Sequence, residues 1–355
     1  MADLSWTARV GADLDPAALW DDYRPTGLIE LPRLADLAKV GRVFVKLEGE
    51  RPLGNFKSLG GMAAGLRALA RDTGMRTLGE LKDYRNRGTP LQRLVCASDG
   101  NHGLAVAAAA ASVGAVATIY LPLGVSRARA RRIEDFGGDI VRINGTYDHA
   151  VLEAASAAAR EGGLLIPDTT VSLSDPVVED VMSGYAVLAR ELVSQFRDDV
   201  KDPPTHMCIQ AGVGGLAAAM ASGLDGLMQQ PEMLLVVEPK SAACVARALA
   251  AGRPVRLSGD LQTCASMLSC GLASAPALRI LQRHGARAVV VGEDQLQRSM
   301  LVLRDAGGPD STPSGAAGLA GLLHVASNPR LRAEHFLGSE SKVLLVATEG
   351  AVAGE

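Results

Sequence analysis

The chain has 355 residues, of which 48% are hydrophobic, and its formal net charge is −3. This length is sufficient for two lobes that each bury a core. The chain has no basic block and only 3% aromatic residues, which argues against a nucleic-acid surface and favours a small-molecule partner.

The cysteines and the N-terminal residues predict a reduced, cytoplasmic protein. The five cysteines are odd in number, include no CxxC pair and mostly lie in apolar segments (Cys96, Cys208, Cys244, Cys264 and Cys270). The spacing of Cys264 and Cys270 gives little support for a zinc site, so no metal is expected. Residues 1–20 lack the basic start and apolar core of a signal peptide.

Strand-like apolar runs alternate with helical runs along most of the chain. The expected strands are Val43–Glu48, Leu94–Ala97, Ala117–Leu121, Asp139–Ile143, Met207–Gln210, Leu234–Val237, Ala288–Val291 and Val343–Ala347. The expected helices include Gly61–Arg71, Arg127–Phe136 and Tyr147–Glu161. This alternation predicts an α/β protein with open, mainly parallel sheets flanked by helices. Ligands then belong at the loops that leave the carboxyl ends of the strands.

Three further segments bear on the organisation of the chain. The apolar run Leu104–Leu123 is nearly long enough to span a bilayer, but Gly114 divides it into an alanine-rich helix and a strand ending at Pro122. The charged segment Asp72–Arg93 is expected to leave the core. The composition of Arg197–Pro204 predicts a surface linker.

The first loop with chemical potential is Gly54–Gly61, which contains Lys57. Most lysines are solvated surface residues. The apolar and glycine-rich neighbours of Lys57 predict partial enclosure, which lowers the pKa of an ammonium and frees the amine as a nucleophile.

The second loop, Ser98–Gly103, follows a strand and precedes a helix. Such a loop aims backbone N–H groups at a helix N-terminus, where an anion binds readily. An acidic side chain in this loop suggests proton transfer by Asp99 as well as binding. The alternative is that Asp99 only bonds to its own backbone in an Asx turn.

The third loop, Ala211–Leu216, also follows a strand and opens an alanine-rich helix, so it predicts a phosphate cradle. Gly212, Gly214 and Ala217 nearly match the dinucleotide fingerprint, and Glu238 ends the next strand. A nicotinamide-dependent oxidoreductase is therefore an alternative. The last loop, Ala347–Gly350, offers the Thr348 hydroxyl or forms an ordinary turn.

The order of these loops resembles the fold-type II pyridoxal-phosphate enzymes, the tryptophan synthase β and threonine dehydratase superfamily, over roughly residues 25–350. The resemblance implies that Lys57 binds the cofactor covalently and that Asn101 contacts its 3′-oxygen. It implies that Thr348 faces the pyridine nitrogen. The residues it assigns to the phosphate are Gly212, Val213, Gly214, Gly215 and Leu216. It also implies a large cofactor-binding domain (1–60 and 160–355), a smaller mobile domain with the substrate loop (61–159) and a homodimer.

Within that superfamily, three segments look most like the diaminopropionate ammonia-lyases: Ser98–Gly103, Pro167–Thr170 with Gly184-Tyr185, and Cys264–Gly271. This resemblance implies that Asp99 and Asp168 bind the amino groups of the substrate and that Asp99 acts as base towards the D isomer. The remaining residues assigned to the substrate are Ser98, Gly100 and His102. The chain departs from the pattern at Ser98, where threonine is usual, and over Val171–Val181.

The implied activity is α,β-elimination on a β-substituted amino acid such as 2,3-diaminopropionate, giving a 2-keto acid and ammonia. Lys57 and Asp99 would serve as bases on opposite faces, and Asp168 would pair with a β-ammonium. Dehydration of serine, threonine or 3-hydroxyaspartate, β-replacement and racemisation share the early steps and stay open. A non-catalytic paralogue is disfavoured because Lys57 and the phosphate loop are both present.

Overall fold

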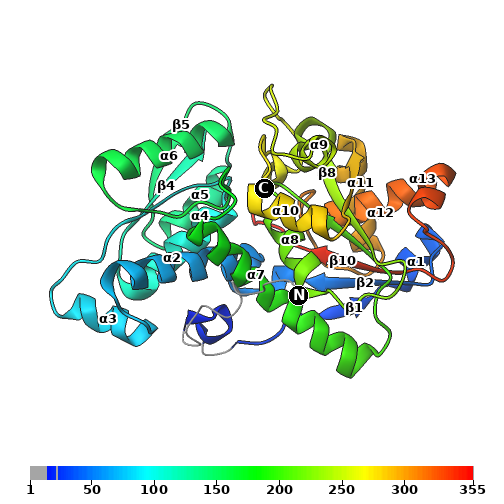
Figure 1. Ribbon diagram of the computed structural model, residues 1–355, viewed down its shortest axis with the longest axis horizontal. Helices are drawn as coiled ribbons and strands as arrows, with labels where there is room; N and C mark the ends of the chain where they lie inside the picture. Colours follow the sequence, from blue (N-terminus) through cyan, green and yellow to red (C-terminus); the bar gives the residue numbers. More distant parts are fainter. Residues whose placement is uncertain (1–13, 21–22, 355) are drawn as a thin grey trace. The chain divides into compact units, whose positions relative to one another are not determined.

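A computed structural model describes residues 14–20 and 23–354, and the chain divides into two compact units (Figure 1). Unit 1 comprises residues 57–187 with the described parts of 1–24 and 352–355, and unit 2 comprises residues 25–56 and 188–351. Residues 160–187, which were expected in the large domain, lie in the same unit as residues 61–159, the expected smaller domain.

Two contacts explain why residues 160–187 belong to unit 1. A short strand, β6 (Leu164–Leu165), pairs in parallel with β3 (Leu94–Ala97). A Cβ at Gly184 would lie 2.7 Å from the Cα of Gly60, so the helices carrying these glycines are in backbone contact. The apolar pattern of the sequence predicts neither contact.

Unit 1 contains a parallel sheet of four strands in the order β5-β4-β3-β6. The other two strands are β4 (Ala117–Pro122) and β5 (Asp139–Ile143). Figure 1 shows helices around these strands. The helices are α2 (Lys57–Thr73), α3 (Leu78–Asn86), α4 (Asn101–Val113), α5 (Arg127–Glu134), α6 (Tyr147–Glu161) and the first part of α7 (Pro176–Ser194).

The apolar run Leu104–Leu123 is divided as the sequence predicted. Helix α4 ends at Gly114, whose φ of 68° gives the left-handed cap that glycine adopts without strain, and strand β4 follows. In the part of the chain that the structure describes, no helix is long and apolar enough to cross a membrane.

Unit 2 contains a sheet of six strands in the order β1-β2-β10-β7-β8-β9, with only the β1–β2 pair antiparallel. The strands are β1 (Leu28–Glu30), β2 (Arg42–Leu47), β7 (His206–Gln210), β8 (Met233–Pro239), β9 (Arg287–Val291) and β10 (Lys342–Ala347). The helices are α1 (Pro32–Ala38), α8 (Gly215–Gly223), α9 (Cys244–Ala251), α10 (Ala275–Arg283), α11 (Glu293–Asp305), α12 (Ala317–Ser327) and α13 (Pro329–Glu334).

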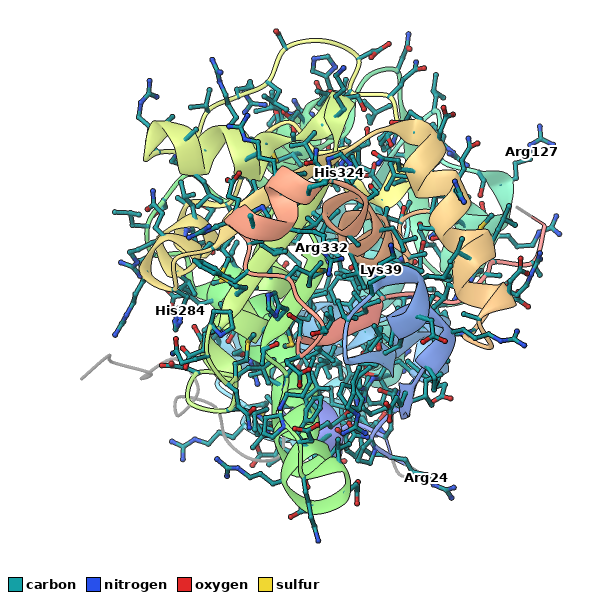
Figure 2. All side chains as sticks on the ribbon, turned by 90° about the vertical axis from the view of Figure 1, so that its right-hand side faces the viewer. Arg24, Lys39, Arg127, His284, His324 and Arg332 are labelled. Carbon is teal, nitrogen blue, oxygen red and sulfur yellow. The ribbon has the colours of Figure 1, made fainter. Side chains whose placement is uncertain are left out.

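A helix end in unit 2 shows how surface arginines complete the backbone hydrogen bonding. Arg332 of α13 donates to the carbonyl oxygens of Ala38 (2.7 Å) and Lys39 (2.9 Å), where α1 ends (Figure 2). These carbonyls have no partner within the helix, so Arg332 caps α1 from another part of the sequence.

The segment Arg197–Pro204 is only partly the linker that its composition predicts. Residues Gln195–Val200 form a π-helical turn that continues α7. Phe196 is fully buried, and its ring meets that of Phe44 edge-on with 5.3 Å between the centroids. This aromatic contact stabilises local structure that the charged composition does not indicate.

Candidate active site

The loop Ser98–Gly103 joins β3 to α4 in unit 1. The Ser98 hydroxyl oxygen accepts hydrogen bonds from the N–H groups of Gly100 and Gly103, each at 2.8 Å. Gly100 has a φ of 135°, and a Cβ at Gly103 would lie 2.5 Å from Ile119. Two N–H groups that were expected to bind an anion are therefore bonded to Ser98 within the loop. The Ser98 hydroxyl accepts both bonds, so its own proton can be donated to another group.

Asp99 lies half-buried in this loop. Burial raises the pKa of its carboxyl to about 8, and the negative charge of Asp168 raises it further against the opposing charges of Lys57 and Arg129. A carboxyl with a pKa near neutrality can hold a proton at neutral pH and release it to become a base.

Asp168, which is buried, and Lys57, which is partly buried, form an ion pair in unit 1. Lys57 Nζ donates to Asp168 Oδ2 at 2.6 Å, and the Tyr147 hydroxyl donates to Asp168 Oδ1. Burial would raise the pKa of Asp168. The Lys57 ammonium and the hydrogen bonds from Lys57 and Tyr147 outweigh it and hold that pKa well below its usual range. The two aspartates assigned to the substrate thus have pKa values displaced in opposite directions.

His102 and Asn101 lie at the start of α4. His102 Nε2 lies 2.8 Å from the carbonyl oxygen of Ile166, so Nε2 carries the proton, and burial lowers the pKa of the ring. His102 therefore holds the segment two residues before Asp168. Asn101 Oδ1 accepts from Arg129 Nη1 at 3.1 Å.

The glycine loop of unit 2 runs from the end of β7 to α8. Its carbonyls are occupied: that of Gly212 accepts from Cys244 Sγ (3.2 Å), that of Val213 from the Ser274 N–H, and that of Gly214 from the helix. Among the described residues, the N–H groups of Gly212 through Gly215 take part in no backbone hydrogen bond. Gly214, with a φ of 95°, caps α8 without a side chain. Unpaired donors at a helix N-terminus fit a phosphate group.

Thr348 follows β10 and is buried. Its Oγ1 accepts from Gln210 Nε2 at 3.0 Å, and the same Gln210 nitrogen lies 2.8 Å from the carbonyl oxygen of Gly315. Because Gln210 Nε2 only donates, the Thr348 hydroxyl keeps its own proton for another acceptor. A pyridine nitrogen is such an acceptor.

Glu238 does not have the role that the nicotinamide alternative requires. It is fully buried, and its carboxylate accepts from the N–H groups of Val245 and Ala246 at 2.7 Å each. Burial raises the pKa of Glu238 to about 8. The side chain caps α9 and is not exposed to a ribose, so the feature that supported a dinucleotide site has a structural explanation.

Sequence reasoning missed three polar residues of these sites: Tyr147, Arg129 and Gln210. Tyr147 follows the carboxyl end of β5, and Gln210 ends β7, so the rule that ligands lie at strand carboxyl ends could have found both. Arg129 lies within helix α5 and carries no such signal. Among the described residues, no group of three His, Cys, Asp or Glu side chains could hold a metal ion.

The chain is similar to proteins named diaminopropionate ammonia-lyase over most of its length. It is 33% identical to the diaminopropionate ammonia-lyase of Escherichia coli K12, over 92% of this chain and 85% of that protein, and 30% identical to that of Salmonella typhimurium LT2, over 93% and 86%. The structure of the E. coli enzyme with an aminoacrylate-PLP azomethine intermediate matches with a TM-score of 0.84 and 30% identity, covering 99% of this chain and 90% of that one.

A family model described as pyridoxal-phosphate dependent enzyme matches residues 19–349. Three features fit that cofactor. The N–H groups of the glycine loop make no backbone hydrogen bond, the Thr348 hydroxyl can donate its proton, and the Lys57 amine is partly enclosed. The chain therefore belongs to the pyridoxal-phosphate dependent enzyme family, with the fold-type II architecture.

Proposed function

We propose that this enzyme catalyses α,β-elimination on 2,3-diaminopropionate or a closely related β-amino amino acid. The products would be a 2-keto acid and two equivalents of ammonia, one from the β position and one on hydrolysis. Relatives named diaminopropionate ammonia-lyase, which match this chain over 85% and 86% of their own length, support the proposal.

The observation that carries the proposal is the ammonium site at Asp168. In the structure this buried carboxylate already binds an ammonium, that of Lys57, and Tyr147 holds its other oxygen. While Lys57 is bound to the cofactor, before the substrate releases its amine, Asp168 needs another cation, because an unpaired buried carboxylate is costly. The β-ammonium of diaminopropionate supplies one, and serine does not.

We assign the cofactor residues as the family resemblance implies. Lys57 would bind the aldehyde carbon, Asn101 the 3′-oxygen and Thr348 the pyridine nitrogen. The phosphate would bind to Gly212, Val213, Gly214, Gly215 and Leu216. When bound, pyridoxal phosphate supplies a ring that delocalises the electron pair left at Cα after proton loss.

The proton transfers would be divided between two bases. The Lys57 amine would take the Cα proton of one enantiomer, and the Asp99 carboxylate would take that of the other. Asp99 has the raised pKa that this role needs, whereas Asp168 stays ionised to hold the leaving amino group. The Ser98 hydroxyl, with Gly100 and His102, would form the substrate side of the loop.

Dehydration of serine or a related hydroxyamino acid is the second candidate. The E. coli enzyme has been crystallised with D-serine, and that structure matches this chain with a TM-score of 0.85. The human serine dehydratase-like protein is 28% identical over 79% of this chain. A hydroxyl leaving group would not use the ammonium site at Asp168, so diaminopropionate is the favoured substrate.

A substrate panel tests the proposal. Release of keto acid and ammonia would be measured for both enantiomers of 2,3-diaminopropionate, serine, threonine and 3-hydroxyaspartate, with Lys57→Ala as the control. We expect the highest kcat/KM for diaminopropionate, and Asp168→Asn should reduce it more for diaminopropionate than for serine. Failure of the enzyme on both enantiomers of diaminopropionate would refute the substrate and leave the cofactor assignment standing.

We also propose that the enzyme is a cytoplasmic homodimer. The family resemblance supports the dimer, and the burial of four of the five cysteines agrees with a reducing compartment. Light scattering of the purified enzyme during size-exclusion chromatography measures the assembly, and a monomer at working concentration would refute the dimer.

A further inference from the structure

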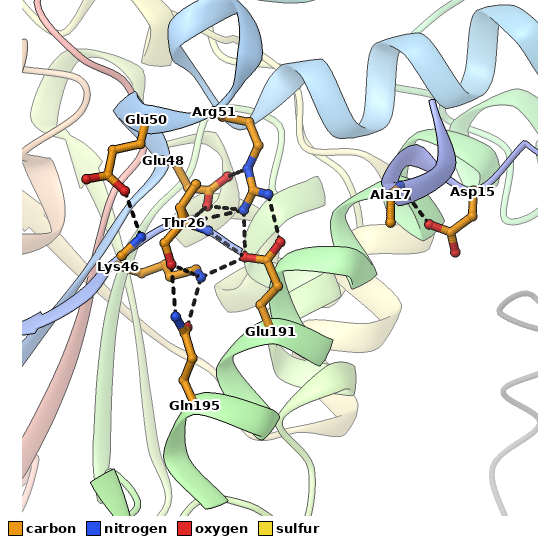
Figure 3. Close-up of polar contacts among 10 residues, drawn as sticks. Asp15, Ala17, Thr26, Lys46, Glu48, Glu50, Arg51, Glu191 and Gln195 are labelled. Atoms are coloured by element: carbon orange, nitrogen blue, oxygen red, sulfur yellow. Dashed lines mark hydrogen bonds and ion pairs between the residues drawn. The ribbon is translucent and has the colours of Figure 1, made fainter. Parts of the chain in front are cut away.

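A buried cluster of four charged side chains lies in unit 2, away from the residues assigned above. Lys46 and Arg51 supply two positive charges, and Glu48 and Glu191 supply two negative ones (Figure 3). The side chains of Lys46, Glu48 and Arg51 are 0% exposed and that of Glu191 is 5% exposed. Buried charges are costly unless fully paired, so this cluster requires an explanation.

Arg51 is the centre of this charge cluster. Its guanidinium forks to Glu48 through Nη2 (2.6 Å) and Nε (3.0 Å), and to Glu191 through Nη1 (2.7 Å) and Nη2 (2.8 Å). Lys46 Nζ binds Glu191 Oε2 at 2.7 Å and the carbonyl oxygen of Thr26 at 2.8 Å. The planar fork of arginine suits two carboxylates at once, a geometry that lysine cannot reproduce.

The charge cluster fixes one side of the turn at residues 48–56. Glu48 and Arg51 belong to this turn, and the Gly54 N–H donates to the Arg51 carbonyl at 2.7 Å. Leu53 and Gly54 both have a φ of 70°, so the turn is tight. A leucine with positive φ is strained and persists only where its surroundings hold it.

The other side of the same turn is bonded to the end of β10. The Phe56 N–H donates to the Thr348 carbonyl at 3.1 Å, and the Gly350 N–H donates to the Gly54 carbonyl at 3.1 Å. A Cβ at Gly49 would lie 2.9 Å from the Gly350 nitrogen, so the two backbones touch. The turn is thus held between the charge cluster and the segment that carries Thr348, and Lys57 is the next residue after Phe56.

We propose that Arg51 is a positioning residue for the cofactor lysine, Lys57. Arg51 and its two carboxylate partners fix the turn at residues 48–56, and Lys57 directly follows Phe56, whose N–H is bonded to the Thr348 carbonyl. The inference rests on the proposed role of Lys57. A turn that is free to shift would change the direction in which the Lys57 amine is presented, even with every cofactor-binding residue intact.

The test compares Arg51→Lys with Arg42→Lys. Arg42 lies on strand β2 and also forks between two carboxylates, Glu30 (2.6 and 2.9 Å) and Asp202 (2.9 Å), but it lies outside the turn at 48–56. Both variants keep the charge. We expect Arg51→Lys to raise the dissociation constant of pyridoxal phosphate at least about tenfold and to shift the pH midpoint of the bound chromophore. Arg42→Lys should change neither, even if its melting temperature falls.

Borohydride reduction followed by peptide mapping of the holoenzyme separates the two levels of the inference. A label on a residue other than Lys57 would refute the role of Lys57 and this inference with it. A label on Lys57, with an Arg51→Lys holoenzyme that melts lower but keeps the cofactor affinity and chromophore of the wild type, would overturn only the positioning role. If Arg51→Lys does not fold, Thr26→Val decides by the same readouts, because it removes a hydroxyl that donates to Glu48 at 2.7 Å and accepts from Arg51 Nη2 at 3.2 Å.

Discussion

Replacing Asp99 by asparagine should make the protein more stable while reducing its activity. In the folded chain the pKa of this carboxyl is about 8 instead of its ordinary value of 3.8. At neutral pH it is therefore mostly protonated when folded and ionised when unfolded, and this difference favours unfolding. Asparagine resembles the protonated acid in shape but has no proton to lose, so the variant avoids this loss of stability.

The magnitude follows from the two pKa values. At pH 7 the solution is about three pH units above the pKa of the unfolded carboxyl, 3.8. Each unit corresponds to about 1.4 kcal/mol, so keeping the folded carboxyl protonated costs at most about 4 kcal/mol of stability. Asp99 is only half-buried, so solvent and relaxation reduce this to about 2 kcal/mol. For a chain of this size that corresponds to a rise in melting temperature of roughly 2–6 °C.

The sign of the pH dependence makes the prediction specific. The penalty is absent below the unfolded pKa of 3.8, grows as the pH rises and becomes constant above about 8. The gain in the Asp99→Asn holoenzyme should therefore increase between about pH 5 and pH 8. Differential scanning calorimetry across this range measures it. Asp72→Asn, at an exposed position of α2, is the matched control.

Kinetics complete the test of Asp99. If Asp99 is the base for one enantiomer, kcat/KM for that enantiomer should rise as the pH passes about 8, and Asp99→Asn should abolish that rise for it alone. An asparagine variant that is less stable at pH 7, or whose gain is the same at both ends of the pH range, would refute the electrostatic reasoning. Equal losses for both enantiomers would refute the division between two bases.

Three further changes test neighbouring parts of the site. Tyr147→Phe should raise KM for diaminopropionate about tenfold, because Asp168 loses the hydroxyl that holds it. A tenfold rise corresponds to a loss of about 1.4 kcal/mol of binding free energy. An equal rise of KM for serine would contradict this reason. Gly214→Ala should weaken cofactor binding in a fluorescence titration, because Gly214 caps the helix α8 whose N-terminus would hold the phosphate. Gly226→Ala is the control, since Gly226 also has a positive φ but does not cap α8, and it should leave cofactor binding unchanged. Glu238→Gln should leave cofactor affinity unchanged. It should also make the free energy of unfolding less dependent on pH between about 5 and 8, because the raised pKa of the Glu238 carboxyl costs stability as the pH rises. Chemical denaturation at several pH values measures this dependence.

Local sequence patterns predicted most of the strands and the loops that follow them. The bounds of β3 and β5 agree with the expected Leu94–Ala97 and Asp139–Ile143, because each is a short apolar or alternating run ended by turn residues. Strands β1 and β6 were missed. They have three and two residues, so the neighbouring strand and not their own pattern determines them.

Contacts between distant parts of the sequence could not be predicted in the same way. Tyr147 and Asp168 are 21 residues apart, and Arg51 and Glu191 are 140 residues apart. Each pair is formed by the packing of whole elements, and no local pattern indicates it. Glu238 shows the converse problem, because its position near the end of a strand fits a ribose ligand and a buried helix cap equally well.

The ion pair of Lys57 and Asp168 joins the proposed chemistry to the electrostatics of unit 1. The sequence suggested only that enclosure would free the Lys57 amine, and the structure adds a carboxylate partner, Asp168, at 2.6 Å. If the cofactor binds Lys57 as proposed, Asp168 loses this cation. The carboxylate remains bonded to Tyr147 and buried, so a second cation is then strongly preferred over water. In the proposed reaction, a substrate that carries a β-ammonium meets this requirement as it binds, whereas with a hydroxyamino acid Asp168 has no cation until the Lys57 amine is released from the cofactor. Under this proposal, Asp168 pairs with the lysine before the cofactor binds and favours a substrate with a β-ammonium afterwards.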